Sequence, residues 1–155
     1  DARGNVQIGA GEGFNAPNKI NNYYGPVTGS VTWTGATTNP AIGNGTFTAN
    51  VSRAGRRVTL TVLVSMGSTT TYGSGNWQFS LPVTGTSIND IGSAFYICGG
   101  GLYVGIARVQ ISSNNIILFS ANNTSNAVQS TVPAVWANGN SLEFTVTYTA
   151  ANQLG

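Results

Sequence analysis

The sequence feature that most constrains the fold is a strict alternation of apolar and polar side chains. Two stretches show it most clearly, residues 57–66 and residues 141–149. Their apolar members are Val58, Leu60, Val62, Val64 and Met66 in the first and Leu142, Phe144, Val146 and Tyr148 in the second. Successive side chains of a strand point to opposite faces, so this period predicts half-buried strands. We therefore predict that the Val58–Met66 face is core and that Glu143 faces outward.

Shorter stretches of the same kind recur from residue 27 onward. They are residues 27–34, 46–52, 76–83, 93–98, 102–111 and 116–119. Turn-forming clusters separate them, and no window has the 3.6-residue period of an amphipathic helix. The sequence thus predicts an all-β fold of eight or nine strands, an antiparallel β-sandwich of jelly-roll type. Leu63 departs from the alternation, because it falls on the polar face of its strand, where it would be a contact in an oligomer.

The domain organisation predicted from the sequence is one β-sandwich domain with an extended segment before it. Residues 1–26 are rich in Gly and Asn and are interpreted as a linker or stalk end that is ordered only by packing on something else. Residues 27–155 form the predicted domain. The chain begins with Asp1 instead of Met, which we interpret as a fragment or processed product of a longer protein.

The composition of the chain limits the kinds of partner that it is expected to bind. Charged residues make up 6% of the chain, against roughly a quarter of an average domain. Gly, Asn, Ser and Thr supply 72 of the 155 residues, so the surface is polar but uncharged. The six cations are too scattered for a nucleic-acid interface, and the cluster of Arg53, Arg56 and Arg57 is interpreted as a solvated turn between two strands. No apolar run reaches 18 residues, so we predict no membrane insertion.

The residues that most enzymes need are scarce. The chain has no histidine, which removes the commonest general base and zinc ligand. Asp90 and Glu143 are the only carboxylate pair in the predicted domain, one in a turn-like loop and one on an outward strand face. Cys98 is flanked by apolar residues and is interpreted as a buried small hydrophobe. We predict no enzymatic activity, no catalytic residue, no metal and no cofactor.

Aromatic rings and neutral amides remain as binding chemistry. Rings stack on sugar faces and amides pair with hydroxyls, so this set suits glycan binding as well as core packing. Trp33, Trp77 and Trp136 share faces or neighbours with apolar residues and are predicted core. The candidate binding residues are Tyr72 in the Ser68–Gly75 loop, Tyr103 after the glycine triplet, and Asn114 and Asn115 at a strand turn. The alternative is that these loops are only turns that the fold requires.

Three stretches of the chain resemble one known family. They are WTGATTNPAIGNGT from Trp33, MGSTTTYGSGNWQFSLP from Met66 and TVPAVWANGNSL from Thr131, followed by Thr147 and Tyr148. They resemble the C-terminal domain of phage tail-fibre and related minor virion structural proteins. Residues 1–9 also resemble the repeat-like segment that often precedes a fibre tip. The family has no invariant ligand-binding motif, so no binding residue is carried over.

The resemblance implies a virion protein that forms a homotrimeric fibre. Its expected partners are other virion structural proteins and a host surface polysaccharide or lipopolysaccharide. The leading hypothesis is therefore a receptor-binding tail-fibre tip. The alternative is a capsid decoration or head-fibre protein on the capsid surface. A third reading, an enzyme that acts on surface polysaccharide, is opposed by the scarcity of acidic residues.

Overall fold

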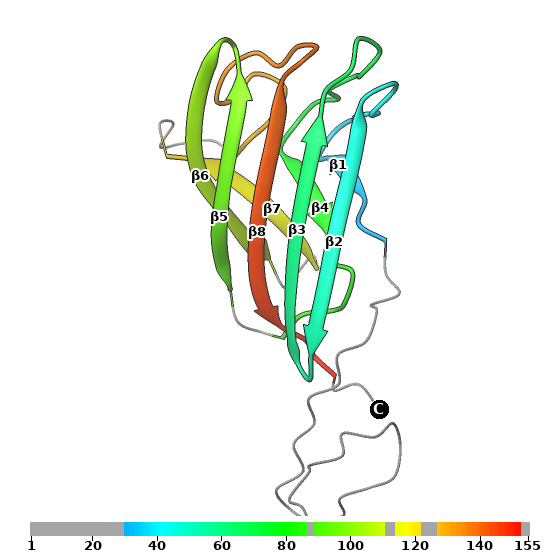
Figure 1. Cartoon of the computed structure of the whole chain (residues 1–155), viewed down its shortest axis with the longest axis vertical. Helices are drawn as coiled ribbons and strands as arrows, with labels where there is room; N and C mark the ends of the chain where they lie inside the picture. Colours follow the sequence, from blue (N-terminus) through cyan, green and yellow to red (C-terminus); the bar gives the residue numbers. More distant parts are fainter. Residues whose placement is uncertain (1–29, 87–88, 111–113, 122–126, 153–155) are drawn as a thin grey trace, which may run out of the picture.

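The computed structural model describes residues 30–86, 89–110, 114–121 and 127–152, and within these ranges the regular elements are all strands (Figure 1). They are β1 (Trp33–Gly35), β2 (Thr46–Ala54), β3 (Arg57–Ser65), β4 (Trp77–Ser80), β5 (Ile91–Cys98), β6 (Gly101–Gln110), β7 (Asn115–Ser120) and β8 (Ser141–Thr149). The all-β prediction is confirmed. The predicted linker at residues 1–26 lies outside the described residues.

The eight strands form one antiparallel sheet that curls into a half-barrel. Their order across the sheet is β1-β4-β7-β6-β5-β8-β3-β2. Hydrogen bonding runs unbroken from β4 through β7, β6 and β5 to β8 and β3. A jelly-roll sandwich would instead divide the strands between two sheets, and this finer prediction is not confirmed. Strands β1 and β2, neighbours in the chain, lie at opposite edges of the sheet.

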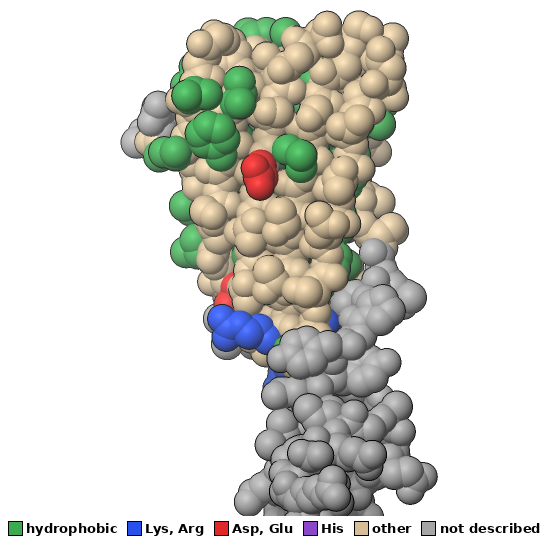
Figure 2. Space-filling view, viewed as in Figure 1, with side chains coloured by type: hydrophobic (Ala, Val, Ile, Leu, Met, Phe, Trp, Pro, Cys, Tyr) green, Lys and Arg blue, Asp and Glu red, His purple; other side chains and the backbone are tan. Residues whose placement is uncertain are grey.

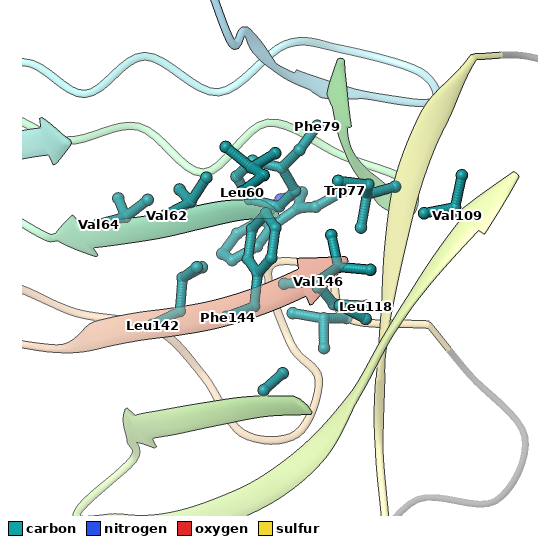
Figure 3. Packing of buried hydrophobic residues seen from close by; sticks show 14 of the residues in the cluster. Leu60, Val62, Val64, Trp77, Phe79, Val109, Leu118, Leu142, Phe144 and Val146 are labelled. Carbon is teal, nitrogen blue, oxygen red and sulfur yellow. The ribbon is translucent and has the colours of Figure 1, made fainter. Parts of the chain in front are cut away.

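Aromatic side chains from strands that are far apart in the sheet order meet across the concave face. Phe79 of β4 packs edge-on against Phe144 of β8, with ring centroids 5.0 Å apart, and lies 6.3 Å from Phe47 of β2 (Figure 3). Trp77 contacts both Trp33 and Trp136. The β1-β4-β7 end of the sheet therefore covers the β8-β3-β2 end, and the apolar side chains of both are removed from water.

The predicted core faces are confirmed. The side chains of Val58, Leu60, Val62 and Val64 are fully buried, and Met66 is 3% exposed. The inward side chains of β8 are buried as well, and Glu143 is exposed as predicted. Cys98 is buried in the same core. Trp77 and Trp136 are buried, whereas Trp33 on the edge strand β1 is half-buried.

The arginine cluster lies at the β2–β3 turn, where the prediction was wrong for one residue. Arg56 and Arg57 are exposed, but Arg53 is only 7% exposed. Its Nε donates to the carbonyl of Gly55 at 2.8 Å, and an Nη donates to the carbonyl of Asn152. Two main-chain carbonyls, one from the turn itself and one from the segment after β8, therefore accept from two of the five guanidinium donors at a buried position. The sequence alone does not place those carbonyls beside Arg53.

The half-barrel has two distinct ends (Figure 1). The root end holds the β2–β3 turn and the last residue of β8, Thr149. Ser30 also lies there, because Ser80 Oγ, at the last residue of β4, donates to its carbonyl. The opposite end, here called the loop end, holds residues 36–45, 67–76, 99–101 and 133–140. The chain therefore enters and leaves the described domain at the root end.

Candidate functional site

Two loops at the loop end are joined into one surface. Residues 36–45 and 67–76 form antiparallel bridges at Thr38 with Ser74 and at Ala41 with Thr71. The Asn44 side chain accepts hydrogen bonds from the main-chain N–H of Thr69 at 2.9 Å and from its hydroxyl at 3.0 Å. These contacts fix the loop backbones, so the exposed polar groups that they carry are held in place before any ligand arrives.

The close approach of the two loops depends on Gly73. Its φ is +59°, and a Cβ built there would lie 2.2 Å from the carbonyl oxygen of Thr38. Only glycine fits both the positive φ and the contact distance. The residue that follows Tyr72 is thus required for the backbone of the loop.

Tyr72 lies in this surface, as its position between two polar runs predicted. It is half-buried, since part of its ring packs against the core. Its carbonyl accepts a 2.9 Å hydrogen bond from Trp77 Nε1. Burial raises the pKa of the Tyr72 hydroxyl. One part of the ring is therefore fixed by the fold, and the rest is accessible from the loop end.

Tyr103 lies in strand β6, in agreement with the strand predicted at residues 102–111. Its register partner is Tyr96 on β5, and it packs half-buried against the core. A Cβ built on Gly101 would lie 2.9 Å from the Tyr103 hydroxyl, so the ring covers that glycine. Tyr103 is thus near the loop end, but its ring belongs to the concave face of the sheet.

Asn114 and Asn115 lie at the root end, away from Tyr72. Asn114 has a φ of +51°, and its Oδ1 accepts from the N–H of Gly85 at 3.3 Å. Asn115 is buried in β7, where its Nδ2 donates to Gln78 Oε1 at 2.8 Å. Both amides contribute to the fold where they lie. The four candidate residues are therefore divided between the two ends of the half-barrel.

The loop end also presents groups that the sequence analysis did not single out. Asn44, Ser68 and Thr69 are exposed side by side, with Asn44 Nδ2 donating to Ser68 Oγ at 3.0 Å. Val135 is 66% exposed in the neighbouring segment 133–140. Ranges 36–45, 67–76, 99–101 and 133–140 contain no charged residue. This absence of charge is the sequence signal that could have identified the surface.

The carboxylates of the described ranges are far apart. Asp90 Oδ2 accepts from the N–H of Thr149, at the root end of β8. Glu143 lies on β8 six residues before Thr149. At ~3.3 Å per residue, this places Glu143 about 20 Å along the strand from Thr149 and therefore from Asp90. Glycosidases place their two carboxylates roughly 5 to 10 Å apart. The two groups cannot act on one glycosidic bond.

The described residues lack two kinds of feature. They contain no cluster of three His, Cys, Asp or Glu side chains that could hold a metal ion. They also contain no helical segment with the length and hydropathy of a membrane span. Burial raises the pKa of the Cys98 thiol, which keeps this buried sulfur in its less reactive protonated form.

The fold and the loop end together define an all-β structural domain with an uncharged surface of hydroxyl and amide groups. In sequence, the chain is 32% identical over 114 residues to the Mu-like prophage FluMu defective tail fiber protein of Haemophilus influenzae. The match covers 71% of this chain but only 18% of that protein. The chain therefore spans less than a fifth of the length of this relative. No family model matches the chain, and no solved structure matches it.

Proposed function

We propose that this chain is a non-enzymatic domain of a phage tail fibre that attaches the virion to a host cell-surface polysaccharide or lipopolysaccharide. The observation that carries the proposal is the sequence relation to a prophage tail fiber protein. The position of the loop end in the half-barrel supports the proposed attachment role. The loop end is opposite the end at which the chain enters and leaves the domain, so it is available to a surface beyond a fibre.

The chemistry of the loop end favours a neutral or weakly anionic glycan. Hydroxyl and amide side chains such as Asn44, Ser68 and Thr69 match sugar hydroxyls as donors and acceptors. The accessible part of the Tyr72 ring supplies an apolar surface for a sugar ring, with Tyr103 as the second aromatic candidate. Asn114 and Asn115 lie at the root end and fall outside this proposed contact. Binding should depend little on salt, because there is no charge at the loop end to be screened.

A homotrimer and a virion location are part of the same proposal. A single uncharged sugar site is weak, and threefold display raises the overall avidity without new contacts. The root end would face the other virion structural proteins. Immunogold labelling of intact virions with an antibody to this domain tests the location. Labelling of the tail supports the proposal, whereas labelling of the head would support the alternative of a capsid decoration or head-fibre protein.

Adsorption of the purified chain to host cells tests the proposed contact. Tyr72→Ala should reduce adsorption at least several-fold, and Tyr72→Phe should retain it, because stacking needs the ring and not the hydroxyl. Asn50→Ala, an exposed change on the edge strand β2, is the matched control and should adsorb like wild type. Melting curves confirm that each variant is folded. Adsorption unchanged in both Tyr72→Ala and Tyr103→Ala, or lost in moderate salt, would remove the loop end from consideration.

A further inference from the structure

The convex surface of the sheet is divided into two chemically different parts. Over β3 and β8 it consists mainly of threonine side chains, paired across the strands. The hydroxyls of Thr59 and Thr147 are 2.9 Å apart, and so are those of Thr61 and Thr145. Over β5 and β6 the same surface is apolar. The division falls within one continuous hydrogen-bonded sheet, so it is a property of the side chains and not of the backbone.

We call the apolar part the outer apolar face. It comprises large side chains that are all at least 39% exposed: Ile91, Phe95 and Ile97 of β5 and Leu102, Val104 and Ile106 of β6. Leu63 of β3 is 42% exposed and lies outside this face, on the far side of β8. Phe95 is paired with Val104 across the strands, and Ile97 with Leu102. Figure 2 shows apolar side chains gathered over this part of the sheet. They are contiguous because neighbouring strands place them at the same levels.

Such a face is unusual in a folded domain that is otherwise rich in neutral polar residues. Contiguous apolar patches on soluble monomers rarely exceed a few hundred Å² and mark contact sites when they do. The concave core does not need these side chains, because the alternate residues Ala94, Tyr96 and Cys98 of β5 already fill it. Their position on the convex side therefore points to an intermolecular contact.

Two charges of opposite sign lie beside this face. Glu143 of β8 is the register partner of both Phe95 and Leu63, and it is exposed. A shallow hollow of about 170 Å³ lies between Glu143, Phe95 and Val104. Arg108 of β6 is paired with Ile91, near the root end. One flank of the face thus carries the anion and the other flank carries the cation.

We propose that the outer apolar face is the surface through which copies of this chain contact one another. In a closed threefold arrangement, one flank of each copy meets the opposite flank of the next. The β8 flank, with Glu143 and Leu63, then meets the β6 flank, with Val104 and Arg108. Opposite charges at the edge of an apolar centre are the composition of a protein interface with a polar rim. This inference rests on the homotrimer of the proposed function and adds the surface that forms it.

Sedimentation velocity of the purified chain at micromolar concentration tests the inference. Wild type should sediment as a trimer. Leu102→Lys with Val104→Lys should weaken association by at least tenfold and give a folded monomer, because both side chains are already exposed and the core is unchanged. Asn50→Lys places the same charge on an exposed position of β2, outside the face, and should leave the trimer intact.

Cysteine cross-linking tests the arrangement of the flanks. A chain with both Leu63→Cys and Val104→Cys should form covalent trimers on mild oxidation, since each copy then bonds to two neighbours. Either single cysteine variant should not proceed beyond dimers. The native thiol of Cys98 is buried and does not interfere.

The possible failures can be separated. A wild-type trimer that persists in the double lysine variant would overturn this surface and leave the homotrimer standing. A monomeric wild type would overturn both the surface and the homotrimer, although the adsorption test of the loop end would still stand. A monomeric wild type that binds another purified virion protein through Val104 would assign the face to that partner and overturn the inference.

Discussion

The hydroxyl of Tyr148 donates a 2.9 Å hydrogen bond to the carbonyl of Val83 and accepts one at 3.3 Å from the N–H of the same residue. Tyr148 is a buried residue of β8, and Val83 lies in the segment that follows β4. One side chain therefore satisfies both main-chain groups of a residue 65 positions away. The contact fixes the segment after β4 to β8, an interior strand of the sheet, at the root end.

The first prediction concerns alkaline pH. Burial raises the pKa of Tyr148 from 10.0 to about 12, while the Val83 hydrogen bond and the charge of Arg53 partly oppose the rise. The pKa of Tyr148 is higher in the folded chain than in the unfolded chain. The contribution of Tyr148 to the free energy of unfolding is therefore complete below pH 10 and is lost as the pH rises from about 10 towards 12. The melting temperature should fall steeply across that interval.

Tyr148→Phe is the variant that checks this assignment. It should be less stable than wild type at pH 8 by about 1 kcal/mol, the usual net value of a lost hydrogen bond. Its melting temperature should fall less steeply above pH 10. A shallower fall should remain, because burial also raises the pKa of Tyr96. A slope identical to that of wild type would show that Tyr148 does not contribute to the pH dependence.

The second prediction concerns the two faces of β3. Val62 is fully buried, whereas its neighbour Thr61 is on the convex face and pairs with Thr145. Val62→Asp should unfold the domain, because an unpaired buried carboxylate costs several kcal/mol, about the whole stability of a domain. Thr61→Asp should be much milder. Equal urea midpoints for the two variants would contradict the burial of one face only.

The third prediction concerns the buried guanidinium. Arg53→Ala leaves the carbonyls of Gly55 and Asn152 without their donor, so urea denaturation should show a loss of about 1.5 to 3 kcal/mol, the range for hydrogen bonds to charged groups. Arg57→Ala at the same turn removes an exposed cation and should change the stability by less than about 0.5 kcal/mol. Comparable losses in both variants would indicate that the turn, and not the burial of Arg53, determines the effect.

The fourth prediction is the absence of hydrolysis. Incubation of the domain with host envelope polysaccharide should release no reducing ends, because Asp90 and Glu143 are held at different positions along β8. If reducing ends do appear and Asp90→Asn abolishes them, the reading of this chain as a polysaccharide-cleaving enzyme is restored. Asn50→Ala serves as the protein control.

Strands β3 and β8 could be predicted almost to the residue, because strict alternation identifies both the strand and its buried face. The same reasoning was less informative for β6. Leu102, Tyr103, Val104 and Ile106 are apolar on both faces, so the pattern does not tell which face is inward. The strand itself was predicted, but for this reason the outer apolar face was not foreseen.

The order in which the strands pair to form one sheet also could not be predicted from the sequence. The pairing of Trp33 with Phe79 joins residues that are distant in the chain, and no local pattern specifies it. The roles of Asn114 and Asn115 depend on Gly85 and Gln78, which belong to other segments. The uncharged loop end, in contrast, is visible as a property of four loop segments once the fold has brought them together.

The position of β8 in the sheet has a consequence for synthesis of the chain. The last described strand of the domain, β8, lies between β5 and β3, in the interior of the sheet order. A nascent chain that stops before Ser141 therefore holds two separate part-sheets, β2-β3 and β1-β4-β7-β6-β5, each with an open edge where β8 belongs. Such edges readily pair with other chains. A truncation at this point would divide the domain, and the nascent domain is most prone to aggregate in the interval before β8 leaves the ribosome.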